Sequence, residues 1–218
     1  MEPVGERFDP DCCRCARLAE FLATVHAKHP DYHARPVASF GDDEARLLIV
    51  GLAPGMHGAN ATGRPFTGDF AGILLYRTLF EFGFASRPES VAADDGLQLS
   101  DCRITNAVRC LPPENKPVTA EVNACNPFLA RELGGLPRPG VVVALGTIAH
   151  RAVLRACGLK QARYRFAHCA SHDLGAGVRL IDSYHCSRYN TQTKRLTEDM
   201  FRQVFHAVRG ELDDAEGR

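Results

Sequence analysis

The order of apolar and polar residues along the chain predicts strands that alternate with helices. Residues 47–52 and 141–145 are short, continuous apolar runs, which are typical of strands buried on both faces. Residues 103–108 and 178–184 are two further strand candidates. Apolar residues at helical spacing predict helices at 16–28, at 69–82, at 119–133 with Thr119 as N-cap, at 147–157 with Thr147 as N-cap, and at 197–208 with Gly210 at the end.

This alternation indicates the α/β class. Strands that alternate with helices form a parallel sheet covered on both faces, so we predict a three-layer αβα fold with a central, mainly parallel, four-stranded sheet. In such a sheet, ligands bind beyond the carboxyl ends of the strands. We expect one domain over residues 1–210 and a disordered acidic tail over residues 211–218.

Composition narrows the class of protein. The chain has 218 residues, 45% of them hydrophobic, yet no apolar run approaches the roughly 18 residues that a membrane span needs. The first ten residues carry three acidic side chains and no apolar segment, which excludes a secretory signal and an arginine-rich transit peptide. We therefore expect a cytoplasmic protein. Nine cysteines, an odd number, favour reduced thiols, some of them metal ligands, over a disulfide scaffold.

The charged residues are balanced in number but unevenly distributed. The formal net charge is zero, from 26 basic and 26 acidic residues. Between residues 138 and 195, however, ten Lys or Arg residues stand against only Asp173 and Asp182. Such a basic region is either a surface that faces phosphates or an ordinary solvated face.

Polar clusters follow three of the predicted strands, where a parallel sheet places its ligands. They are residues 51–69, residues 105–106 and residues 184–191. Gly51, Gly55 and Gly58 in the first cluster would let backbone N–H groups approach a ligand closely. This segment lacks the Gly-Lys-Ser/Thr ending of a phosphate-binding loop and the glycine spacing of a dinucleotide fold, so neither is favoured.

Four cysteines from two separated segments form a candidate metal site. Cys12 and Cys15 form a Cys-x-x-Cys pair, while Cys110 and Cys125 are fifteen residues apart. Four thiolates can bind a zinc ion or hold an iron–sulfur cluster. The alternatives are that Cys110 and Cys125 are small buried hydrophobic residues, and that Cys13 replaces Cys12 as a ligand.

Three motifs resemble those of a known family. The segments GLAPGMHGANATGRPFTGDFAG, ITNAVRCLPPENKP and SYHCSRYNT, in this order and together with the cysteines, resemble the uracil-DNA glycosylase superfamily. The similarity is closest to its family 5, the iron–sulfur B-type enzymes of bacteria and archaea, and runs from about residue 12 to about residue 205. Family 4 enzymes carry an acidic residue directly after the first glycine of the first motif, whereas this chain has Leu52.

The resemblance implies an enzyme that hydrolyses the N-glycosidic bond of uracil, or of another deaminated base, flipped out of single- or double-stranded DNA. Phe66 would stack on the base, and the Asn106 amide would read the uracil edge. The same residues are also compatible with a core Phe and a turn-forming Asn. The implied substrate-binding set is Gly51, Ala53, Gly55, Phe66 and Asn106, with His57 as a secondary candidate.

The resemblance also implies two catalytic residues. Asp69 matches the carboxylate that orients water and stabilises positive charge on the sugar, and His185 matches the histidine that donates to the leaving base. As structural alternatives, Asp69 caps the helix that follows it, and His185 is a satisfied loop histidine. No lysine stands near these motifs as an amine nucleophile, so we expect a monofunctional enzyme that leaves an abasic site without strand cleavage.

The third motif and the residues after it are the implied DNA contacts. They are Arg188, Tyr189, Asn190, Lys194 and Arg195. The chain departs from the family pattern at Tyr189, where Gln is usual, and at Lys194, where Gly is usual. The sequence therefore leaves open which side chain of residues 186–195 enters the DNA.

The cofactor and partners follow from the same resemblance. It implies a structural 4Fe–4S cluster bound by Cys12, Cys15, Cys110 and Cys125, and a monomer that binds uracil-containing DNA. Two other classes stay open: an iron–sulfur or zinc-stabilised nucleic-acid-binding module of the same fold without glycosylase activity, and an iron–sulfur electron carrier. The joint presence of Asp69, Asn106 and His185 favours the glycosylase.

Overall fold

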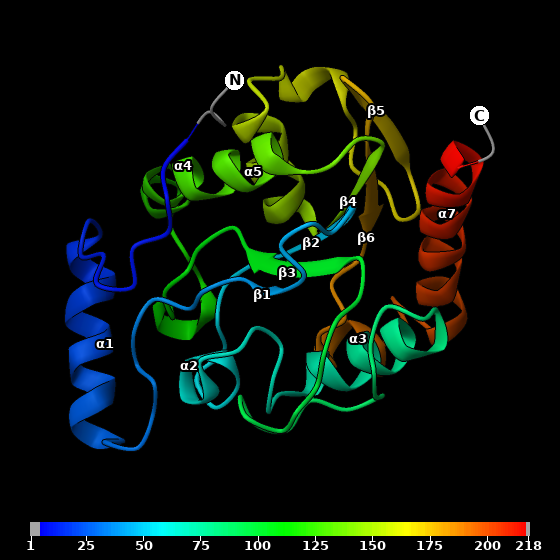
Figure 1. The fold of residues 1–218 in the computed structure, drawn as a ribbon. Coiled ribbons are helices and arrows are strands. Elements are labelled where there is room, and N and C mark those ends of the chain that lie inside the picture. The colour runs from blue at the N-terminus through cyan, green and yellow to red at the C-terminus, as the bar shows by residue number, and fades with distance from the viewer. Residues whose placement is uncertain (1–4, 217–218) are drawn as a thin grey trace.

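Six strands form one sheet in the order β1-β3-β2-β4-β6-β5 (Figure 1). The structure, a computed structural model, describes residues 5–216. The four inner strands are parallel and the two edge strands are antiparallel to their neighbours. Their bounds are β1 Phe40–Gly41, β2 Leu47–Gly51, β3 Cys102–Asn106, β4 Gly140–Leu145, β5 Ser171–Gly175 and β6 Val178–Ser183.

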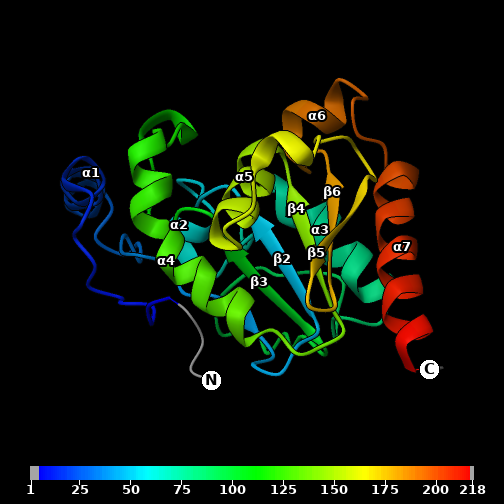
Figure 2. The same ribbon diagram turned by 90° about the horizontal axis from the view of Figure 1, so that it is seen from above.

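Helices cover both faces of this sheet (Figures 1 and 2). Leu47 and Ile49 of β2 pack toward α3 and α7, whereas Leu48 and Val50 pack toward α4 and α5. This alternation within one apolar run gives the predicted three-layer αβα fold. The helices are α1 Ala16–Lys28, α2 Ala59–Thr62, α3 Phe70–Glu81, α4 Thr119–Gly135, α5 Thr147–Ala156, α6 Arg188–Gln192 and α7 Glu198–Glu216, with short 3₁₀ turns at Pro113–Asn115 and Gln161–Arg163.

The sheet has two strands more than the four predicted. β1 contains only two residues, and β5 is the polar segment SHDLG at the outer edge. An edge strand pairs on one side only and has a less covered face, so it carries no continuous apolar run by which the sequence could reveal it. The four strands that the sequence predicts are the parallel inner ones.

Two predicted helix caps are one residue out of place. The N-cap of α4 is Val118, whose N–H donates to Glu121 Oε2 at 2.8 Å, and Thr119 is the first helical residue. The N-cap of α5 is Gly146, with φ +97°, and Thr147 follows it. A glycine adopts this backbone conformation without strain, so the β4–α5 turn does not need a threonine cap.

The C-terminal helix is longer than predicted. α7 continues through Gly210 to Glu216, so the prediction of a disordered tail is wrong for residues 211–216, while residues 217–218 lie outside the described residues. Leu212 is fully buried and continues the apolar stripe of Val204 and Val208 by one more turn. Within residues 5–216, no helix combines the length and the apolar character that crossing a membrane requires.

Candidate active site

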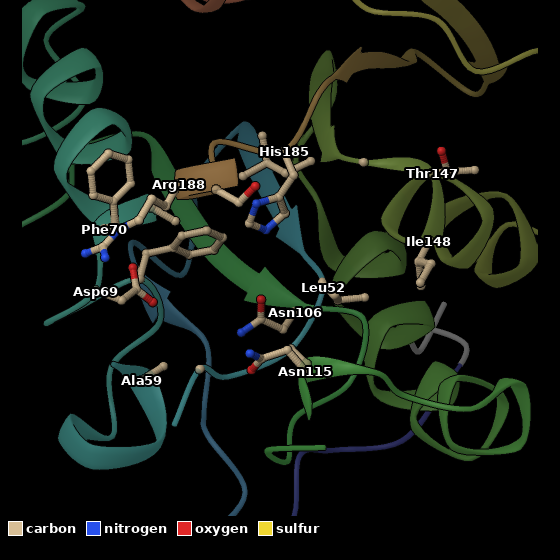
Figure 3. A pocket seen from close by; sticks show the side chains of 17 residues that line it. Leu52, Ala59, Asp69, Phe70, Asn106, Asn115, Thr147, Ile148, His185 and Arg188 are labelled. Atoms are coloured by element: carbon tan, nitrogen blue, oxygen red, sulfur yellow. The ribbon is translucent and has the colours of Figure 1, made fainter. Parts of the chain in front are cut away.

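The carboxyl ends of four inner strands surround a pocket of about 490 Å³. Leu52 and Ala53 follow β2, Asn106 ends β3, Leu145 ends β4, and His185 is the second residue after β6. The pocket therefore lies where a parallel sheet places its ligand, as the sequence predicts. The N-termini of α3 and α5 complete its walls with Asp69, Phe70, Thr147 and Ile148 (Figure 3).

Gly51 lies behind the pocket wall, because it pairs with Asn106 across the β2–β3 register. A Cβ atom at Gly51 would lie 2.6 Å from Phe66 Cζ and would also collide with Asn106 Oδ1. Real Cβ atoms do not approach other atoms this closely. Glycine at this position is therefore what allows the Phe66 ring and the Asn106 amide to lie side by side.

Phe66 and Asn106 form the flat and the polar part of the pocket. Phe66 is buried and has φ +54°, a strained conformation for a non-glycine residue. Its ring stacks on His185, with centroids 6.0 Å apart and 28° between the ring planes. The buried Asn106 Oδ1 atom has no hydrogen-bond partner within the described residues, so an acceptor is left for a ligand.

Asp69 both caps a helix and lines the pocket, two positions that the sequence left as alternatives. It is the N-cap of α3, since Oδ1 accepts from Gly72 N–H at 2.9 Å, and it also lines the pocket. Burial raises the pKa of this carboxyl, while the hydrogen bonds from Gly72 and Ala71 lower it. A capping carboxylate uses one oxygen for the helix, and Oδ2 is left to act on a bound molecule.

His185 is held as a neutral imidazole. Burial lowers its pKa to about 4, because a charged ring is poorly solvated between Phe66 and the pocket wall. In the described part of the chain, the buried Nδ1 atom has no hydrogen-bond partner. The Asn190 amide donates to the His185 carbonyl at 2.9 Å and so helps to fix the backbone of the histidine.

Asn115 is a pocket residue that the sequence reasoning missed. It ends the 3₁₀ turn Pro113–Asn115 with φ +56°, and it lines the pocket beside Asn106 (Figure 3). The side chains of Asp69, His185, Asn106 and Asn115 surround the same space. The signal available in the sequence was the second motif itself, in which prolines precede Asn115 and bring it back toward the sheet.

Besides Gly51, His57 is a predicted substrate contact that does not line the pocket. Its Nδ1 atom lies 2.8 Å from the Tyr32 hydroxyl, and its ring lies edge-on to Tyr32 and to His29. It does not line the pocket, whereas Ala53 and Gly55 of the same motif do. The geometry therefore gives no support to a role of His57 in positioning water.

An exposed rim beside the pocket is formed after β6 by Arg188, Tyr189, Lys194 and Arg195. The Arg188 guanidinium lies 5.1 Å from the centre of the Phe70 ring and reaches the pocket, and that of Arg195 lies 4.8 Å from the Tyr184 ring. Tyr189, at the start of α6, is 70% exposed. Lys194 is exposed and lines a neighbouring groove with Phe70. This rim can bind a long anionic molecule beside the pocket.

The four predicted ligand cysteines come together at one place. Cys12 and Cys15 before α1, Cys110 after β3 and Cys125 in α4 line the same small cavity, whereas the exposed Cys13 does not. Burial and, next, the neighbouring cysteines raise the pKa of Cys110 to about 12, so a bound cation is what would let this thiol ionise. Arg109 N–H donates to Cys125 Sγ at 3.3 Å.

Known proteins are similar to this chain over most of its length. Residues 38–209 match the family model described as "Uracil DNA glycosylase superfamily". The type-5 uracil-DNA glycosylase of Thermus thermophilus is 49% identical over 198 residues, covering 88% of this chain and 90% of the relative. The type-5 enzyme of Pyrobaculum aerophilum is 42% identical, covering 89% and 86%, and that of Mycobacterium leprae is 44% identical, covering 89% and 88%.

Proposed function

The chain belongs to the uracil DNA glycosylase superfamily, and we propose that it hydrolyses the N-glycosidic bond of uracil in DNA. The observation that carries this proposal is the convergence of Phe66, Asn106, Asp69 and His185 on one pocket (Figure 3). The pocket is large enough for one flipped base with its sugar, at about 490 Å³. The product is a free base and an abasic site in an otherwise intact strand.

Recognition of the base uses a ring and an amide. The Phe66 ring stacks on a base that has left the DNA stack, which replaces part of the lost stacking energy. The Asn106 amide accepts from the uracil N3–H and donates to O4, so a cytosine presents the wrong pattern of donors and acceptors. Asn115 lies beside this amide and is placed to contact the same ligand.

Bond breaking develops positive charge on the sugar and negative charge on the departing base. The Asp69 carboxylate stabilises the first charge and orients the attacking water through Oδ2. The neutral His185 ring donates a hydrogen bond toward the base oxygen that becomes negative. Both groups are fixed before the reaction, Asp69 by its helix cap and His185 by Phe66 and Asn190.

One assay separates this proposal from the binding module without activity. The full chain is incubated with a single-stranded and a double-stranded oligonucleotide, each with one uracil, and with thymine-containing controls. We expect alkali-labile sites only at uracil, and no nick before alkali treatment. Tight binding of uracil-containing DNA without any abasic site would instead support the module.

Gly51→Ala tests whether the pocket needs the close approach at this position. The added methyl group must displace the Phe66 ring or the Asn106 amide. We expect the single-turnover rate to fall at least about tenfold, because 1 Å of misplacement in a site can cost more than this. Met56→Leu, in the same loop but outside the pocket lining, is a control for general loop effects. Unchanged rates in Gly51→Ala would mean that neither group needs its observed place.

We propose that the exposed rim binds the DNA backbone and that Tyr189 is the side chain that enters the base stack. Arg188, Lys194 and Arg195 supply the phosphate contacts, so affinity should fall steeply with salt. Arg195→Ala should reduce the slope of log affinity against log salt by roughly one unit. Arg155→Ala, in the last turn of α5 and outside the pocket lining, should leave it unchanged. A salt-independent affinity would make the rim an ordinary solvated surface.

We propose that Cys12, Cys15, Cys110 and Cys125 bind a structural 4Fe–4S cluster, which fixes the N-terminal segment to the sheet. The four cysteines come from three separate segments and line one small cavity, and four thiolates are the ligand set of such a cluster. We expect the enzyme to act as a monomer on chromosomal DNA in the cytoplasm.

A further inference from the structure

Three side chains that belong neither to the pocket nor to the cysteine site come together where α5 lies against β5 and β6. His150 of α5, Asp182 of β6 and His172 of β5 place their ligand atoms within 4.8 Å of one another. His150 Nδ1 lies 2.8 Å from Asp182 Oδ1, and His172 Nε2 lies 3.1 Å from Asp182 Oδ2. The glycosylase reaction uses none of these three residues.

Both ring nitrogens of His150 face hydrogen-bond acceptors. Its Nε2 atom lies 3.0 Å from the Tyr164 carbonyl oxygen, which only accepts, so Nε2 carries the N–H. In a neutral ring Nδ1 then carries a lone pair, and it points at a carboxylate oxygen, which is also an acceptor. A positive charge removes this conflict, either as a proton on Nδ1 or as a metal cation bound beside both atoms. An imidazole that donates its other N–H to a backbone carbonyl is the usual arrangement of a metal-binding histidine.

The Asp182 carboxylate needs a compensating positive charge because it is buried. The side chain of Asp182 is 0% exposed and that of His150 is 3% exposed. No lysine or arginine within residues 5–216 forms an ion pair with Asp182, and the two histidines are its side-chain partners. A buried carboxylate without a compensating positive charge is strongly disfavoured.

We propose that His150 Nδ1, His172 Nε2 and an oxygen of Asp182 bind one zinc ion. Two imidazoles and one carboxylate suit Zn²⁺, which takes three protein ligands and a water in its open sites. The side chain of His172 is 14% exposed and gives water access to the fourth position. The ion would fasten edge strand β5 and helix α5 to β6, close to the points where α5 and β6 reach the pocket at Thr147 and His185.

Cobalt is the probe that distinguishes this site from the cysteines. The full chain, with its cysteine site loaded, is titrated with Co²⁺ and then with Zn²⁺. We expect one equivalent of Co²⁺ with ligand-field bands but without sulfur-to-metal charge transfer, and displacement by Zn²⁺. Zn²⁺ should also raise the melting temperature of the wild-type protein, because it binds the folded state.

Two variants and a matched control make the test decisive. His172→Gln, on the edge strand, and Asp182→Asn should each weaken Co²⁺ binding by about a hundredfold and abolish the thermal shift. His168→Gln changes a partly buried histidine near the same strands that contributes no ligand, and should bind like the wild type. No uptake by the wild-type protein, uptake unchanged in both variants, or a sulfur-to-metal charge-transfer band would each overturn the proposal.

Discussion

We expect Asp69→Asn to lower the single-turnover rate of base release by about a hundredfold or more, while the affinity for uracil-containing DNA stays nearly unchanged. The reason is that the carboxylate acts on charge that exists only in the transition state, so its loss affects the rate and not the ground-state complex. Single-turnover kinetics and equilibrium binding, measured on folded protein with its cysteine site loaded, give the two numbers separately.

The same substitution separates catalysis from helix capping. An asparagine side chain still accepts from Gly72 N–H, so α3 keeps its cap and the free energy of unfolding should change little. Asp69→Ala removes the cap as well and should cost about 1 kcal/mol of stability in addition to the rate. Full activity of Asp69→Asn on folded protein would remove Asp69 from the mechanism.

The pH profile gives an independent signature of Asp69. Burial raises its pKa above the usual 3.8, so the carboxylate is protonated as the pH falls, at a higher pH than an exposed aspartate. The wild-type rate should therefore fall on the acid side through this raised pKa, and that decline should be absent in Asp69→Asn. Burial lowers the pKa of His185 to about 4, so this ring also charges on the acid side, and the loss of the decline in Asp69→Asn is what assigns it to Asp69.

We expect Cys110→Ala to yield colourless, poorly folded protein and the wild-type protein to be brown. The proposed cluster would connect the segment before α1 to the loop after β3 and to α4, so its binding free energy would be part of the folding free energy. Iron and sulfide content, the visible spectrum and the thermal transition measure the loss. Cys13→Ala is the matched control, since Cys13 is exposed and does not line the cavity.

Cys13→Ala and a third variant, Cys12→Ala, decide between ligand sets, and the metal content of the wild-type protein decides between metals. If Cys13→Ala loses the colour and Cys12→Ala keeps it, Cys13 is the ligand. A colourless wild-type protein with one equivalent of zinc would contradict the cluster and leave the four-cysteine set intact. In either case the comparison with Cys110→Ala tests whether the site contributes to folding.

Much of the catalytic site was predictable because its residues are tied to local signals. The apolar run of β2 ends in Gly51, and a chain leaving a parallel strand at this edge enters the ligand site. Asp69 stands directly before a helical periodicity, Asn106 ends a strand and His185 follows one. These signals predicted polar clusters at one edge of the sheet, and the family resemblance selected Asp69, Asn106 and His185 within them.

The sequence by itself determined the inner strands, the two-sided cover of the sheet and the motif residues, because apolar periodicity and strand ends are local properties of the chain. Only the tertiary structure decided four features. They are the position of Asn115 in the pocket, the hydrogen bond from Asn190 to the His185 carbonyl, the contact of His57 with Tyr32 and the pairing of β5 with β6. Each of these depends on a partner far away in the sequence or on the backbone conformation of a loop. Such contacts leave no periodic pattern, since the energy that selects them arises only when the distant segments pack.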